Sequence, residues 1–178
     1  MTFFSPDTDV IVLVTASYDL LPKNISMVSG VQQIKPLWTA LGPEKAKALP
    51  AFHAFSGADN TGSFARLGKA TWFGLFLESD DDVIRTLCML CGDTDVTEDF
   101  LESTLARLVC TAYCPKGLHI LSILDLRWHL FCKYMAESEK LPPTMGALKQ
   151  HILRYACASY CLRPGCPFQA GAVGPTAE

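Results

Sequence analysis

The sequence predicts an α/β protein that is mostly helical, and three observations lead to this fold class. Residues 6–14 form a nearly continuous β-branched and leucine-rich run, as in a strand buried on both faces. Apolar residues then recur at helical spacing over most of the remaining chain. With 178 residues, 49% of them hydrophobic, the chain can form one domain with a core, or a small domain with a helical extension.

Proline and glycine divide the region after the first strand. Residues 19–30 are rich in Asn, Ser, Pro and Gly, which predicts a loop with a short strand near 25–28. Residues 31–41 are expected to begin a further short strand or a turn. Gly42-Pro43-Glu44 then opens a helix, which Pro50 is expected to kink or restart.

Helical segments account for the next part of the chain. The pattern predicts a turn and an aromatic-faced helix at 56–77, followed by helices at about 80–91, 97–113 and 119–138. Within the last of these, Trp128 and Phe131 are three residues apart on one helical face, which favours packing in the core.

A final helix is predicted after Pro142-Pro143. Thr144 is placed to cap it, and Leu148, Ile152 and Tyr155 form an apolar stripe along it. We therefore expect three parts, which are residues 1–77 with the strand and the first helices, 78–163 as a helical extension, and 164–178 as a disordered tail rich in Pro and Gly.

The tetrapeptide Asp-Thr-Asp-Val occurs twice, and its surroundings predict different roles. Residues 93–96 are followed by Thr-Glu-Asp, so a helix-capping pair is expected there. Residues 7–10 are followed by an apolar run, which predicts a strand and not a capped helix. Alternate strand residues share a face, so Asp7 and Asp9 would point the same way. Solvated acids at the end of a strand are the alternative.

In whole segments the chain resembles a group of uncharacterised metazoan proteins that occur in many copies and are transposon-derived. The resemblance rests on Ser5–Val10, Leu49–Asp59 and Glu137–Thr144. It spans nearly all of the chain. The function of that group is unknown, so the resemblance implies no activity.

More distantly, the N-terminal part resembles the second half of the PIN-like and flap-endonuclease nuclease domains. In that superfamily a strand bearing D-x-D is followed by G-C-D and by a helix-turn-helix element with glycines in its turn. The positions that match are Asp7, Asp9, Gly57 and Asp59, followed by Phe64, Leu67 and Gly68. The resemblance implies a truncated, Rossmannoid half of a nuclease domain.

This second resemblance implies metal-dependent phosphodiester hydrolysis. Asp7, Asp9 and Asp59 would bind Mg²⁺ or Mn²⁺, which activates water and neutralises the phosphate. A nucleic-acid backbone would be contacted by the turn element, namely by Gly62, Arg66, Gly68 and Lys69. A helix hairpin whose glycine only relieves strain is the alternative reading of that element.

The chain also departs from the superfamily. An earlier aspartate and another acid are expected upstream of the D-x-D strand, where this chain has Met1. Arg66 stands where the first turn glycine is expected, and Ala58 replaces the cysteine. Because two-metal hydrolysis needs enough carboxylates to hold both ions, we expect no appreciable nuclease activity from this chain alone. A missing N-terminal half or a protein partner would cover the open sheet.

The eight cysteines allow two interpretations. Three pairs lie three or four residues apart, which places both side chains on one helix face and is typical of small buried hydrophobes in a reducing compartment. The alternative is a zinc site built from His151, Cys157, Cys161 and Cys166. The gaps between these four match no common zinc-finger spacing, so zinc is not the favoured cofactor.

Charge gives no strong sign of a nucleic-acid surface. The formal net charge is −3 and the isoelectric point is near 5.8, so nucleic-acid binding is expected to be weak and salt-sensitive. No apolar segment approaches the ~20 residues of a spanning helix, and no signal-peptide pattern is present. We expect an intracellular protein, nuclear or cytoplasmic, without a membrane partner.

Two hypotheses for function remain open from the sequence. The first is part of a metal-dependent, PIN-like nuclease that is inactive as this chain alone. The second is a non-catalytic remnant of a transposon, or a helical interaction module.

Overall fold

Helices make up most of the part of the chain that the computed structural model describes, which comprises residues 2–4, 7–21, 26–29, 32–58, 62–90, 98–135 and 137–161. The seven α-helices in this part are α1 (Thr8–Ala16), α2 (Ile34–Phe55), α3 (Lys69–Glu78), α4 (Asp81–Leu90), α5 (Glu98–Tyr113), α6 (Ile123–Tyr134) and α7 (Met145–Cys161). Short 3₁₀ turns lie at Tyr18–Leu20 and Ser138–Lys140.

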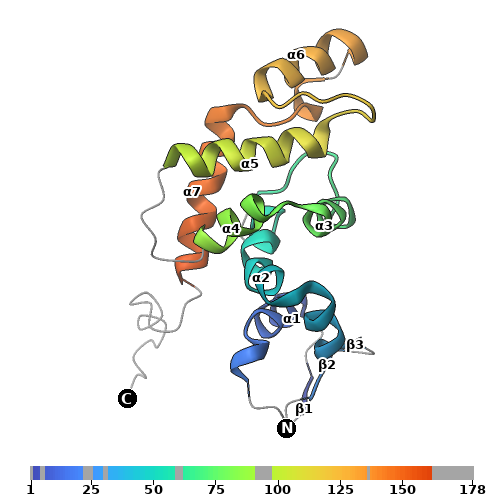
Figure 1. The fold of residues 1–178 in the computed structure, drawn as a ribbon. Coiled ribbons are helices and arrows are strands. Elements are labelled where there is room, and N and C mark those ends of the chain that lie inside the picture. Colours follow the sequence, from blue (N-terminus) through green and yellow to red (C-terminus); the bar gives the residue numbers. More distant parts are fainter. Residues whose placement is uncertain are drawn as a thin grey trace, which may run out of the picture.

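The predicted α/β fold with a Rossmannoid sheet is wrong. The strands described are β1 (Thr2–Phe4), β2 (Ser26–Ser29) and β3 (Gln32–Gln33), in the order β1-β2-β3. β1 runs parallel to β2, and β2 runs antiparallel to β3. A Rossmannoid domain needs a parallel sheet covered by helices on both faces. These strands of two to four residues form only a small ribbon at the end of a helical molecule (Figure 1).

The apolar run predicted as the first strand is instead helix α1. Asp7 has extended backbone angles and its Oδ1 accepts a hydrogen bond of 3.0 Å from the Asp9 amide, so it caps the helix that the sequence pattern did not predict here. Val12 and Thr15 are buried where α1 packs on α2. Strand propensities differ by only about 1 kcal/mol, so a cap and a buried face outweigh the β-branched composition.

Helix α2 forms the centre of the fold and contains one break. Gly42 has φ 76° and ψ 166°, and Pro43 follows it, so the segment consists of two helices joined across a kink. The helix predicted to open at Gly42-Pro43-Glu44 is the second of these. Pro50, which was expected to kink it, lies inside this second helix, where the backbone keeps helical angles. The kink follows Gly42 because glycine tolerates a positive φ.

Aromatic side chains dominate the core between α2, α3 and α7. Phe55 and Trp72 meet edge to face with ring centroids 5.7 Å apart, and Phe52 stacks on Phe76 at 4.4 Å. His151 of α7 lies against Phe55, and its Nε2 is 2.8 Å from the Phe55 carbonyl oxygen. These contacts hold the end of α2 in place. Asp9 and Lys69, two of the predicted site residues, both contact His53 in the last turn of α2.

A single cluster of buried residues extends from Val12 through the core to Ile123 and Leu126, across the predicted boundary at residue 77. The division into three parts stays a prediction, and the expected tail at 164–178 lies outside the described residues. No helix in the described part of the chain is long and apolar enough to cross a membrane.

Candidate functional site

The two predicted strand acids lie at the N-terminus of α1. Asp7 is the cap and Asp9 is in the first turn, so they are not alternate residues of a strand, and the predicted common strand face is wrong. Both nevertheless line the same pocket, together with Lys69 and Ala58. Asp59, the third predicted ligand, lies outside the described residues. The fold thus brings Asp7, Asp9 and Lys69 to one place by a route the sequence did not predict.

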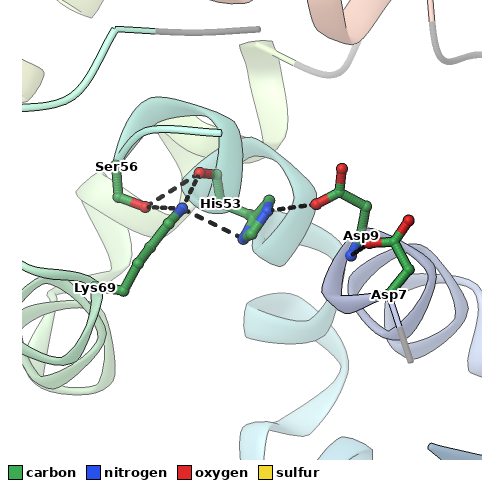
Figure 2. Close-up of polar contacts among 5 residues, drawn as sticks. All are labelled: Asp7, Asp9, His53, Ser56 and Lys69. Carbon is green, nitrogen blue, oxygen red and sulfur yellow. Dashed lines mark hydrogen bonds and ion pairs between the residues drawn. The ribbon is translucent and has the colours of Figure 1, made fainter. Parts of the chain in front are cut away.

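Four polar side chains connect the helices around this pocket, and we call them the Lys69 network: Asp9, His53, Ser56 and Lys69 (Figure 2). Asp9 Oδ1 is 2.8 Å from His53 Nε2. Lys69 Nζ donates to the His53 carbonyl oxygen at 2.8 Å and to Ser56 Oγ at 3.1 Å. The network therefore joins the start of α1, the end of α2 and the start of α3.

The geometry gives each member of the Lys69 network a structural task. Lys69 binds a carbonyl in the last turn of α2, where a cation favourably meets the helix dipole. When His53 donates Nε2–H to Asp9, its Nδ1 is an acceptor and faces Lys69 Nζ at 3.4 Å. Burial lowers the pKa of Lys69, and the nearby Asp9 carboxylate partly opposes that shift.

The pocket beside this network has a volume of about 1000 Å³. Its walls are apolar, from Ile11, Leu37, Phe52 and Phe73, and its rim carries the acids and Lys69. Among the described residues, no group of three or more His, Cys, Asp or Glu side chains is placed to hold a metal ion. The predicted Mg²⁺ or Mn²⁺ site therefore depends on Asp59 and stays a prediction.

The predicted nucleic-acid-binding residues have separate surroundings. Gly68 is the N-cap of α3 with ordinary extended angles. Arg66 has φ 64°, the left-handed conformation that favours glycine. Arg66 lines a pocket with Tyr113 and Leu130, away from the one that Lys69 lines. Gly62 lies beside His151, where an added Cβ would be 3.7 Å from Nδ1.

The alternative zinc site is described only in part. His151 is the member whose side chain the structure describes, and it contacts the Phe55 carbonyl and the rings of Phe55 and Phe64. The side chains of Cys157, Cys161 and Cys166 lie outside the described residues. Cys110 is buried, and burial raises the pKa of its thiol to about 11, which keeps it protonated and unreactive at neutral pH.

Several exposed apolar side chains lie on α6, and the prediction that Trp128 and Phe131 pack in the core is wrong. Trp128 is 67% exposed and Phe131 is 51% exposed. The opposite face of α6 is buried through Ile123 and Leu126. We call this exposed surface the α6 stripe. It consists of Leu124, Trp128 and Phe131 on one face of the helix, with Leu121 just before the helix and Met135 at its C-cap, each at least half exposed.

Within α6 the stripe residues Leu124, Trp128 and Phe131 are four and three residues apart, which is the spacing of helices that pack on another helix. The sequence correctly predicted that Trp128 and Phe131 share one helical face, but this face is exposed and does not pack in the core. His53 and Ser56 of the Lys69 network were missed as site residues, and no spacing signal could have found them. Their contact with Lys69 depends on the turn between α2 and α3.

The fold and these sites define a mostly helical protein with a polar network where α1, α2 and α3 meet (Figure 2) and with α6, which carries exposed apolar side chains, at one end of the molecule (Figure 1). Comparisons with protein-family models, curated proteins and solved structures found no match.

Proposed function

We propose that this chain is a helical interaction module that binds a protein partner through the α6 stripe. The observation that carries the proposal is the exposure of Leu124, Trp128 and Phe131 along one face of α6, with exposed Leu121 and Met135 next to its two ends. Monomeric proteins rarely expose a contiguous apolar surface of more than a few hundred Å², and larger ones mark interaction sites. Burying a side chain of this kind contributes about 1.5–3 kcal/mol.

The orientation of the stripe supports the proposal. Ile123 and Leu126 attach α6 to the core, so the helix cannot rotate to bury Trp128 without exposing them. Ser122 caps the helix by accepting from the Asp125 amide at 3.3 Å, and Arg127 donates to the Pro142 carbonyl. A helix fixed in this way loses little conformational freedom on binding, because its surface is already organised for docking.

The Lys69 network favours a structural role over catalysis. Asp9 holds His53, and Lys69 holds the end of α2, so a reaction at this place would first have to break the contacts that join three helices. A catalytic base needs access to the proton that it abstracts. The α6 stripe has no such conflict, because its side chains already face outward.

The proposal is tested by site-specific photo-crosslinking in cells that express the full chain. A photoreactive phenylalanine analogue is placed at Trp128, and in a matched control at Leu20, which is 82% exposed on the 3₁₀ turn after α1. We expect a discrete crosslinked species at position 128 that disappears when Leu124 and Phe131 are replaced by serine. Equal labelling at both positions, or none at 128, would exclude an interaction module that acts through α6.

A further inference from the structure

We propose that the pocket between α1, α2 and α3 binds a small hydrophobic amine, with its apolar body between the helices and its ammonium head at the carboxylates of Asp7 and Asp9. This inference goes beyond the proposed function and does not depend on the α6 stripe. It is carried by the apolar walls of the pocket and by the hydrogen-bonding capacity that the Lys69 network leaves at the rim.

The pocket has the size and the lining of a small-molecule site. Its volume of about 1000 Å³ is at the upper end of the range of about 300–1,000 Å³ that is typical of ligand pockets. All three helices contribute apolar wall residues, namely Ile11 and Val12 of α1, Leu37 and Phe52 of α2, and Ala70 and Phe73 of α3. An apolar ligand body that enters this space removes both its own surface and that of the walls from water.

The hydrophobic core holds the walls in place. Phe52 stacks on Phe76 with ring centroids 4.4 Å apart, and the Phe73 ring lies 6.4 Å from that of Phe52. Val12, on the opposite helix, belongs to the same buried cluster as Phe52 and Phe76. Because these side chains are already ordered by their neighbours, the pocket loses little conformational freedom when a ligand binds.

The Lys69 network has already used its charged donor and its imidazole donor. Lys69 Nζ faces three acceptors, which are the His53 carbonyl oxygen at 2.8 Å, Ser56 Oγ at 3.1 Å and His53 Nδ1 at 3.4 Å. Ser56 Oγ in turn donates to the His53 carbonyl oxygen, and His53 Nε2 meets Asp9. A ligand with an anionic head would therefore have to displace contacts that join the helices.

Acceptors, by contrast, remain at the rim. One carboxylate oxygen of Asp9 contacts His53, and the other points away from His53 and accepts no hydrogen bond within the described part of the chain (Figure 2). The Asp9 side chain is 53% exposed, so a ligand can reach it. The hydroxyls of Thr8 and Ser63 also line the pocket and can accept. A ligand head that donates hydrogen bonds fits this rim and leaves the network intact.

The charges of the lining favour an ammonium among the possible donors. Two carboxylates, those of Asp7 and Asp9, stand against the one ammonium of Lys69, so a second cation balances the rim. The positive end of α1 lies behind the two acids and weakens their attraction for a cation. The apolar walls therefore supply most of the affinity, and the head supplies selectivity. A bare metal ion cannot use these walls.

The test is a nuclear magnetic resonance titration of the purified full chain, with labelled Ile and Leu methyl groups. Three ligands share one apolar body and differ in their heads: phenylbutylamine, phenylbutanol and phenylbutyrate. We expect saturable shifts at the methyl groups of Ile11 and Leu37. The amine should bind about tenfold more tightly than the alcohol, as for a hydrogen bond to a charged group. The carboxylate should bind more weakly than the alcohol.

A charge variant tests the role of the rim. Asp9→Asn keeps an acceptor for His53 but removes the negative charge, so it should weaken amine binding by about tenfold and leave alcohol binding unchanged. Asp19→Asn is the matched control. It makes the same change on the 3₁₀ turn after α1, outside the pocket lining, and should alter neither affinity.

A size variant tests the role of the walls. Ala70 is exposed near the start of α3 and lines the pocket, so Ala70→Trp should fill part of the space and weaken the binding of all three ligands. Thr71→Trp places the same side chain at the next, exposed position of α3, which does not line the pocket, and should bind like the wild type. Circular dichroism should show the same helical content for both variants.

The outcomes decide the proposal without reference to α6. The absence of saturable shifts at Ile11 and Leu37, or equal affinity for the amine and the alcohol, would overturn it. Loss of amine binding in Asp19→Asn to the same extent as in Asp9→Asn would also overturn it. The Leu124→Ser/Phe131→Ser variant should bind the amine like the wild type, so the interaction module and the amine site can fail separately.

Discussion

Helices α3 and α6 each contain a tryptophan with a phenylalanine within the next three residues, yet the tryptophan of α3 is buried and that of α6 is exposed. Trp72 is fully buried between Phe55 and Phe64, whereas Trp128 is 67% exposed with Phe131 as its aromatic neighbour at 6.2 Å. Helix α3 lies beside the central helix α2, and α6 lies at the far end of the molecule beyond α5 (Figure 1).

The difference shows that an aromatic face identifies a packing surface but not its partner. Each of the two helices buries part of its apolar surface in the core, through Trp72 and Phe76 in α3 and through Ile123 and Leu126 in α6. Helix α6 has a second apolar face, with Trp128 and Phe131 each more than half exposed, that the described part of the chain leaves uncovered. A helix that is apolar on more than one face needs more than one neighbour, and we infer that the second neighbour of α6 comes from another chain.

Truncating each tryptophan to alanine is the most direct test of whether α3 and α6 differ in their contribution to stability. We expect Trp72→Ala to destabilise the protein by about 3–5 kcal/mol, because it leaves a cavity against Phe55 and Phe64. Trp128→Ala should change the unfolding free energy of the monomer by less than about 0.5 kcal/mol. Urea denaturation at low protein concentration measures both.

Because Trp72→Ala removes much of a typical total stability, Trp72→Phe provides a graded variant. The buried Nε1 of Trp72 has no hydrogen-bond partner among the described residues. Replacement by phenylalanine therefore removes an unsatisfied donor along with some volume, and we expect it to cost clearly less than alanine. Equal losses for Trp72→Ala and Trp128→Ala would show that the two regions do not differ as described.

Tyr113, at the end of α5, links the segment before α3 to the part of the molecule that carries α6, and its hydrogen bond can be tested by pH. Its hydroxyl donates to the Ala65 carbonyl at 2.8 Å, and burial raises the pKa of Tyr113 from 10.0 to about 12. The unfolded chain then releases this proton first, so the contribution is complete below pH 10 and is lost between pH 10 and 12. For a half-buried phenol we expect about 1 kcal/mol after solvent screening.

Denaturation at a series of alkaline pH values checks this expectation. Tyr113→Phe should be less stable than wild type at neutral pH by about 1 kcal/mol, the usual value of one hydrogen bond. The two proteins should then converge above pH 10, where the wild type loses its contribution. Parallel pH profiles would mean that the phenol is not protected by the fold.

A third prediction concerns Lys69 at the start of α3, which binds the end of α2. We expect Lys69→Met to cost about 1 kcal/mol, because it removes the hydrogen bonds to the His53 carbonyl and Ser56 Oγ. The pKa of Lys69 is lowered by burial from 10.5, so the folded state releases this proton before the unfolded state does. Wild-type stability should therefore rise with pH in the window below 10.5, and the variant should lack that rise.

Lys47→Met is the matched control for Lys69→Met, because Lys47 is exposed on α2 and forms a surface pair with Glu44. We expect it to change stability by no more than about 0.5 kcal/mol, with no effect on the pH dependence. If both methionine variants behave alike, Lys69 does not hold the end of α2.

The sequence predicts those features of the structure that depend on residues close together in the chain, such as helix caps and apolar stripes. Thr144 was predicted to cap the last helix, and its Oγ1 accepts from the Ala147 amide at 3.2 Å. The buried positions of Leu148 and Ile152 in the predicted apolar stripe are confirmed, and Tyr155 lies outside the part whose side chains are described. Caps and stripes are set by residues within one or two turns, so a single sequence contains them.

The failures involve information from elsewhere in the fold. The run after Asp7 has strand composition, and its helical state is favoured by packing on α2, which lies far along the chain. The Asp9–His53 contact joins residues 44 positions apart. The exposure of Trp128 depends on which other elements of the fold pack against α6. Local composition carries none of these long-range facts.

The smallest expected effect concerns the predicted Mg²⁺ or Mn²⁺ site on α1. Asp7 already caps the helix, Asp9 already pairs with His53, and the positive end of a helix disfavours a cation. We therefore expect only weak binding, in the millimolar range, by calorimetry of the purified chain. The double variant Asp9→Asn/Asp59→Asn should abolish it, whereas Asp81→Asn/Asp82→Asn on α4 should not. Tight binding to the wild type would mean that Asp59 reaches the two acids and that this end of the molecule is a metal site after all.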